Sequence, residues 1–87
     1  MIIQFEMEHC PSCRKLKAML DKFGLGPDQT VIYNDNDAET VAMVEKFKVQ
    51  SFPTLLSVDE SEDYKEDDRI TGLPSLSRLK AFFALDD

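Results

Sequence analysis

Residues 2–13 read IIQFEMEHCPSC, and this stretch decides the fold. Its first half, Ile2 to Met7, is short, rich in apolar residues and followed by polar ones, which is typical of a buried strand. Its second half holds the only two cysteines of the chain, Cys10 and Cys13. Pro11 suits the first position of a helix, where its missing N–H costs nothing. The stretch therefore predicts a strand that leads through a Cys-x-x-Cys pair into a helix.

The helix predicted after the cysteine pair has one apolar face. Its apolar residues recur at helical spacing, and they are Leu16, Met19, Leu20 and Phe23. Gly24, Gly26 and Pro27 then provide signals that end a helix. Thr30 to Tyr33 is β-branched and aromatic, so it predicts a second strand. Because strand-helix-strand crossovers are right-handed and join parallel strands, we expect the first two strands to be parallel.

The remaining residues predict a helix, two strands and a last helix. A turn at residues 34–37 precedes a helix whose expected apolar stripe is Val41, Ala42, Val44 and Phe47. Thr54 to Val58 predicts a third strand, and Arg69 to Thr71 predicts a short fourth strand that ends at Gly72. No helix separates these two strands, so we expect an antiparallel hairpin. Ser75 is a candidate cap for a last helix with the expected inward residues Leu76, Leu79, Phe82 and Phe83.

Length and composition favour one globular domain over residues 1–87. No apolar run approaches the roughly 20 residues that span a bilayer, and the N-terminus lacks the basic segment of a signal peptide. We therefore expect a cytoplasmic protein with no membrane contact. The net charge is −7, and residues 59–68 carry seven acids against one base, Lys65. This distribution argues against nucleic-acid binding, which needs a basic face. We interpret the acidic segment as a solvated connection.

The cysteine pair leaves several kinds of chemistry open. A small secreted scaffold would normally spread more cysteines along the chain, whereas a cytosolic Cys-x-x-Cys pair near a strand-helix-strand unit indicates redox chemistry. A structural disulfide is the plainer alternative, although a bridge that closes so short a loop adds little stability. A structural zinc site needs four ligands, and the chain offers Cys10, Cys13 and His9. We expect no metal, but a half-site shared across a dimer remains an alternative.

Three motifs together resemble the thioredoxin and glutaredoxin superfamily. The first is Cys-Pro-Ser-Cys between the first strand and the first helix. The second is residues 48–56, KVQSFPTLL, which resembles the thioredoxin segment with a cis-proline followed by Thr and a strand. The third is Ile70-Thr71-Gly72 before the last helix. The resemblance implies an α/β thioredoxin fold: a mixed four-stranded sheet of order 2-1-3-4, with strands 1 and 2 parallel and strands 3 and 4 an antiparallel hairpin, flanked by three helices.

The chain resembles glutaredoxins in its size and in the proline that follows the first cysteine. Glutaredoxins that bind glutathione commonly carry a glycine and an Asp pair before the last helix, whereas residues 72–75 read GLPS. The resemblance thus implies a glutaredoxin-sized thioredoxin-like protein. Its expected electron donor is a thioredoxin reductase or, as the alternative, glutathione. We expect no bound cofactor.

The resemblance implies a thiol–disulfide oxidoreductase that reduces protein disulfides. Cys10 would attack the target disulfide, and Cys13 would resolve the mixed disulfide. The helix N-terminus and the nearby Arg14 and Lys15 should lower the pKa of Cys10, and such motifs range from about 3.5 to 7.5. By family analogy a ribonucleotide reductase is one candidate substrate, and we expect a monomer. An adaptor that docks a basic partner through the acidic segment is an alternative without redox chemistry.

The expected substrate-binding residues surround the cysteine pair. They are His9, Pro11, Ser12, Phe52, Pro53, Thr54 and Gly72. Family resemblance implies that Pro53 is cis and that Phe52 offers its backbone to an extended substrate. His9 either places positive charge near the thiolate or occupies an exposed loop. Gln4 stands where thioredoxins commonly bury an Asp, so either water or Glu6 would accept the proton of the resolving thiol. Side-chain alternation places Glu6 on the face of Gln4.

Overall fold

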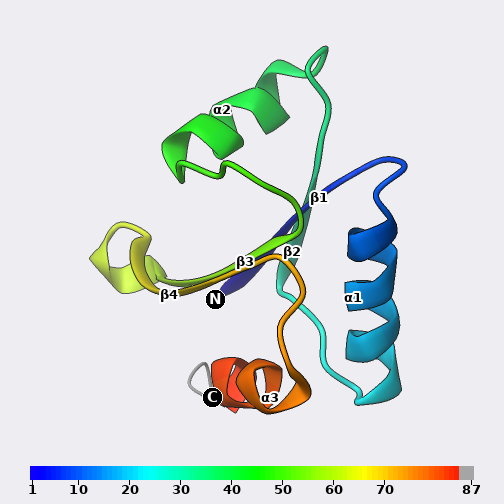
Figure 1. Ribbon diagram of the computed structural model, residues 1–87. Helices are drawn as coiled ribbons and strands as arrows, with labels where there is room; N and C mark the ends of the chain where they lie inside the picture. Colours follow the sequence, from blue (N-terminus) through cyan, green and yellow to red (C-terminus); the bar gives the residue numbers. More distant parts are fainter. Residues whose placement is uncertain (85–87) are drawn as a thin grey trace.

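The computed structural model in Figure 1 describes residues 1–84 and contains a mixed sheet of order β2-β1-β3-β4. Strand β1 (Ile2–Met7) pairs parallel with β2 (Gln29–Tyr33) and antiparallel with β3 (Thr54–Asp59). Strand β4 (Lys65–Thr71) pairs antiparallel with β3. Strand order and directions are those that the resemblance implied, and they confirm the thioredoxin fold. Residues 85–87 of the expected domain lie outside the described range.

Three helices cover the two faces of the sheet within residues 1–84. Helices α1 (Pro11–Lys22) and α3 (Leu76–Ala84) lie on one side, and α2 (Ala38–Lys46) lies on the other (Figure 1). Alternation along β1 explains the two layers, because Ile2 packs on the α1 and α3 side while Ile3 and Phe5 pack on the α2 side. The α1 and α3 layer contains Leu16, Leu20, Leu55, Ile70, Leu79 and Phe82. The α2 layer contains Val31, Phe47, Val49, Leu56 and Val58.

Each helix begins at a capping residue. Cys10 caps α1, and Asp37 caps α2 by accepting the N–H of Glu39 at 3.0 Å. The predicted cap of α3 is confirmed, because the Arg78 N–H donates to the Ser75 Oγ at 3.2 Å. A cap side chain satisfies one of the N–H groups that a helix start leaves unpaired. The first cap fixes where α1 begins relative to the cysteine pair.

Two helical residues lie elsewhere than the periodicity predicted. Ala42 is exposed, and Met43 packs against the α2 layer in its place. Phe23 is exposed as well, and it is the C-cap that follows the last residue of α1. An apolar stripe locates the centre of a helix better than its ends.

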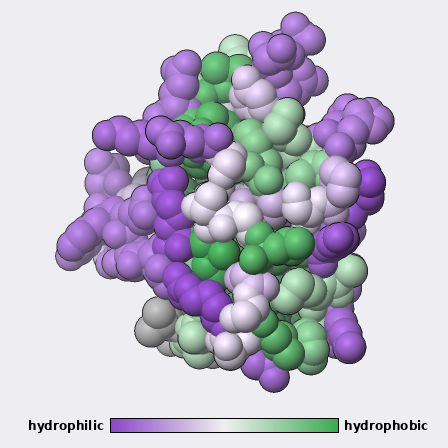
Figure 2. Space-filling view, in the orientation of Figure 1, coloured by the Kyte–Doolittle hydropathy of each residue, from purple (hydrophilic) through white to green (hydrophobic). Residues whose placement is uncertain are grey.

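The acidic segment is not only a connection, and this corrects the sequence-based interpretation. Asp59 ends β3, Glu60–Glu62 forms the short 3-10 helix η1, and β4 begins at Lys65 rather than Arg69. Acidic residues have low strand propensity, but pairing with β3 determines their conformation. A bulge between Ser57 and Val58 shifts the register there. The expected solvation is confirmed, since residues 60–67 are exposed and Figure 2 shows hydrophilic side chains over this hairpin.

Candidate active site

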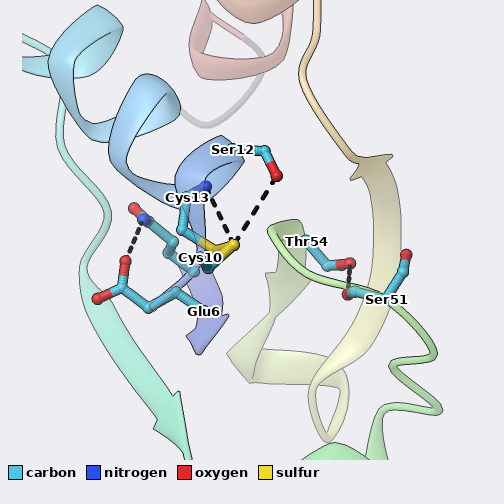
Figure 3. Close-up of a disulfide and its surroundings, with 7 residues drawn as sticks. Glu6, Cys10, Ser12, Cys13, Ser51 and Thr54 are labelled. Carbon is cyan, nitrogen blue, oxygen red and sulfur yellow. Dashed lines mark hydrogen bonds between the residues drawn. A yellow bond between two sulfur atoms is a disulfide. The ribbon is translucent and has the colours of Figure 1, made fainter. Parts of the chain in front are cut away.

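The two cysteines form a disulfide at the first turn of α1 (Figure 3). Because Cys10 is the N-cap, its Sγ lies where backbone N–H groups point out of the helix. The N–H of Cys13 donates to this sulfur at 3.2 Å. The hydroxyl of Ser12 lies 3.8 Å from it. Both contacts favour negative charge on Sγ when the pair is reduced, and the helix dipole acts in the same direction.

The two sulfurs differ in exposure. Cys13 is 4% exposed, whereas Cys10 is only partly buried and Pro11 beside it is exposed. The difference follows from the helix, because Cys13 starts the inward face that continues to Leu16 and Leu20. Cys10 is thus the more accessible of the two cysteines.

The loop before β3 lies across from the cysteine pair. Figure 3 shows Ser51 and Thr54 on the opposite side of the site from the disulfide, and the Thr54 hydroxyl donates to the Ser51 carbonyl at 2.8 Å. The Phe52–Pro53 peptide bond is cis, as the resemblance implied. The N–H of Gly72 donates to the Pro53 carbonyl at 2.9 Å. Residues that are distant in sequence are therefore held together at the end of the sheet that carries Cys10.

Arg69 supports this loop, and no pattern in the sequence points to it. Its guanidinium donates to the Lys48 carbonyl at 3.1 Å and to the Phe47 carbonyl, at the end of α2. It also forms an ion pair with Glu66 at 2.8 Å. These contacts join β4 to the chain segment that leads from α2 to Phe52 and Pro53.

Tyr33 is a second residue that the sequence did not identify. Its ring stacks on Phe52, with centroids 5.5 Å apart and an interplanar angle of 20°. Tyr33 ends β2 and Phe52 precedes Pro53, so the stack connects β2 to the loop beside the cysteines. The only sequence signal that could have pointed to Tyr33 was its position as an aromatic residue at the end of a predicted strand.

Gln4 and Glu6 share one face of β1, as alternation predicted, and this face lies on the α1 side. Gln4 is buried, and its Nε2 donates to Glu6 at 3.1 Å. Figure 3 shows the Glu6 carboxylate directed away from the disulfide. Of the two expected proton acceptors, Glu6 is thus engaged with Gln4 rather than with the pair.

His9 lies on the exposed turn before Cys10 with φ +57°. Its ring makes no hydrogen bond or ion pair to another residue in the range 1–84. No group of three or more His, Cys, Asp or Glu side chains in this range is arranged to hold a metal. A surface hollow of about 690 Å³ lies at the opposite end of the sheet beside Met1 and Asp59, and neither cysteine lines it. None of the helices described is long and apolar enough to cross a membrane.

Comparison with known proteins identifies the family to which this sequence and this fold belong. The sequence model of the thioredoxin family matches residues 1–84. The chain belongs to the thioredoxin family. No curated protein sequence matches it. Membership and the disulfide at the helix start support a thiol–disulfide oxidoreductase.

Solved structures of thioredoxins share the fold at low sequence identity. Plasmodium falciparum thioredoxin has 18% identity and a TM-score of 0.70, over 99% of this chain and 84% of its own. Malassezia sympodialis thioredoxin (Mala s 13) has 15% identity and a TM-score of 0.70, over 98% and 72%. Aeropyrum pernix thioredoxin has 19% identity and a TM-score of 0.69, over 98% and 72%. The family fold is therefore retained in a chain somewhat shorter than these thioredoxins.

Proposed function

We propose that this thioredoxin-family protein is a dithiol electron carrier that reduces protein disulfides. The observation that carries the proposal is the asymmetry of the pair. Cys10 is partly exposed and its sulfur accepts the N–H of Cys13, whereas Cys13 is buried and joined to it by the disulfide. An exposed thiolate attacks a disulfide, and a buried neighbour resolves the product.

The proposed reaction moves two electrons in two exchanges. The Cys10 thiolate attacks one sulfur of the substrate disulfide, whose S–S bond breaks, and the departing substrate thiolate takes a proton from water. Cys13 then loses its proton to water and attacks the Cys10 sulfur. The mixed disulfide breaks, and the second substrate sulfur leaves as a thiolate that is protonated in turn. The substrate is reduced, and the protein is left with the Cys10–Cys13 disulfide.

Substrate approach is proposed along the loop across from the pair. Phe52 precedes a proline, which has no N–H of its own, so the backbone of Phe52 is the nearest one able to pair with an extended segment. Thr54 and Gly72 hold the loop by their bonds to Ser51 and Pro53. In this proposal both are positioning residues.

Single-cysteine variants test the order of attack. A Cys13→Ser variant should accumulate a stable mixed disulfide with a protein substrate, because the resolving thiol is missing. A Cys10→Ser variant should form none and should lose turnover. Non-reducing gels and mass spectrometry of the adduct measure both. Mixed disulfides that form through Cys13 instead would overturn the assignment, and full disulfide-dependent activity of Cys10→Ser would favour the adaptor alternative.

A thioredoxin reductase is the proposed source of electrons. Support comes from residues 72–75, GLPS, which lack the acidic pair typical of glutathione-binding glutaredoxins. Turnover with a thioredoxin reductase and NADPH should exceed turnover with glutathione and glutathione reductase. The potential of the pair should lie between about −180 and −270 mV, the range from disulfide isomerase to thioredoxin. Efficient turnover on glutathione alone would contradict this choice of donor. Monomeric state and cytoplasmic location remain predictions.

A further inference from the structure

A groove opens beside the proposed substrate loop, between the end of β1 and the turn after β2. Its volume is about 380 Å³, and it is lined by Met7, Glu8, Tyr33, Asn34, Asp35 and Asn36. Met7 and Glu8 stand just before Cys10 in the chain, and Tyr33 stacks on Phe52. The groove thus adjoins both sides of the site at which a substrate disulfide would be attacked.

The groove combines apolar surface with negative charge. Met7 is 41% exposed, and the partly exposed ring of Tyr33 lies in the same lining. Glu8 and Asp35 are exposed, and neither side chain makes a hydrogen bond or ion pair to another residue in the range 1–84. No lysine or arginine occurs in residues 1–13 or in residues 29–45, from which both walls are built. The charge of the groove is therefore uncompensated by its own walls.

This surface is complementary to a long basic side chain. Lysine and arginine bury an aliphatic stem against apolar surface while the charged head stays in water. A cation near Tyr33 also gains from the aromatic ring. The lining is too polar for a small apolar ligand, since pockets for such ligands are lined mainly by hydrophobic side chains. An acidic side chain in the same place would meet two like charges.

We propose that this groove selects protein disulfides whose cysteine is flanked by lysine or arginine. The stem of the basic residue would lie on Met7 and Tyr33, and its charge would lie near Glu8 and Asp35. The inference rests on the proposed disulfide reduction and adds the substrate class. The acidic groove is opposite in charge to the start of α1, whose first turns carry Arg14 and Lys15.

The test uses three peptides, each with one disulfide, that are identical except for Lys, Gln or Glu beside the reactive cysteine. Rates of reduction by the reduced protein are measured in single turnover, and each is divided by the rate with dithiothreitol to remove intrinsic reactivity. The corrected rate should fall in the order Lys, Gln, Glu. Exposed ion pairs suggest about 1.5- to 5-fold for each groove carboxylate. The preference should shrink as salt rises, because exposed charges are screened.

Isosteric variants assign the preference to the groove. Glu8→Gln and Asp35→Asn should each reduce the Lys-to-Glu ratio, and the double variant should bring it close to one. Asp67→Asn on the distant hairpin changes the net charge equally and should leave the ratio unaltered. A ratio near one in the unsubstituted protein, or a ratio that Glu8→Gln and Asp35→Asn do not alter, would overturn the inference while disulfide reduction stands. If the protein reduced none of the three peptides and no protein disulfide, both the groove inference and the proposed disulfide reduction would be overturned.

Discussion

Cys10 and Cys13 are three residues apart, but their side chains occupy different environments because a helix begins between them. Cys10 precedes the first helical residue, so its sulfur stays at the surface and accepts a backbone N–H. Cys13 lies on the inward face of the first turn. The two cysteines thus differ chemically because one precedes the helix and the other lies on its inward face.

Gly72 adopts a backbone conformation that other residues rarely take. Its φ is +80°, and a Cβ added there would meet no atom within 4 Å. A Gly72→Ala substitution should therefore act only through the backbone, and should destabilise the protein by about 1–2 kcal/mol. Urea denaturation measures the loss. Gly26→Ala is the matched control, because that site is equally open and its φ is not positive. Equal effects at the two sites would contradict the backbone explanation.

At the scale of elements, the site is assembled where the start of α1, the segment before β3 and the end of β4 meet. Helix α1 supplies the cysteines, the segment after α2 supplies Phe52 and Pro53, and the end of β4 leads into Gly72. A hydrogen bond from the Gly72 N–H to the Pro53 carbonyl joins the last two to each other. Helix α2 is therefore coupled to the site by the chain segment that follows it.

Arg69 is expected to stabilise that segment. An Arg69→Met variant loses the bonds to the carbonyls of Phe47 and Lys48 and the pair with Glu66. We expect a loss of about 1–3 kcal/mol, typical of hydrogen bonds to charged groups. The stability of Arg69→Lys should lie between those of the unsubstituted protein and Arg69→Met. A single ammonium group cannot reproduce the several hydrogen bonds that the planar guanidinium donates.

Denaturant unfolding and the KM for a protein disulfide measure the effects of the Arg69 variants. The KM should rise if the Phe52 loop is displaced. Lys17→Met, on the exposed side of α1, controls for the loss of a cation. A stability of Arg69→Met equal to that of the unsubstituted protein would contradict a role in holding the loop.

At the scale of the whole molecule, negative charge is concentrated on the hairpin of β3 and β4, and two arginines hold it to the rest. Arg69 reaches the end of α2, and Arg78 of α3 donates to both carboxylate oxygens of Asp68, at 2.8 and 3.0 Å. An acidic edge strand also discourages edge-to-edge pairing with another chain. The hairpin thus combines solubility with attachment to helices on both faces of the sheet.

Asp68 gives the stability a dependence on pH. The hydrogen bonds from Arg78 lower the pKa of Asp68 below its usual value. A carboxylate with a lowered folded pKa stabilises the protein above the unfolded pKa of about 3.9, and this contribution is lost as pH falls through the folded value. Asp68→Asn should therefore lower the thermal midpoint by a few degrees near neutral pH and by nothing in strong acid.

Thermal melts of Asp68→Asn at a series of pH values measure this loss. Asp67→Asn is the control, because the side chain of Asp67 makes no ion pair within residues 1–84. A deficit of Asp68→Asn that persisted unchanged in strong acid would contradict the electrostatic origin.

The sequence by itself determined the order of elements, the shared face of Gln4 and Glu6, and the cysteine pair at a helix start. These depend on short-range patterns: alternation along β1, the stripe on α1, and cap residues such as Ser75. The family resemblance, carried by motifs in the sequence, added the sheet order and the cis bond before Pro53. Patterns of this kind are complete within a dozen residues, so the sequence alone contains them.

Only the tertiary structure decided the extent of β4 and the surroundings of the site. Residues 66–68 are acidic and form part of a strand because β3 pairs with this segment, which no local propensity indicates. The reach of Arg69 to the end of α2, the stack of Tyr33 on Phe52, and the groove beside Glu8 and Asp35 each join residues far apart in the chain. Such contacts depend on how elements pack in space, and that packing is invisible to periodicity.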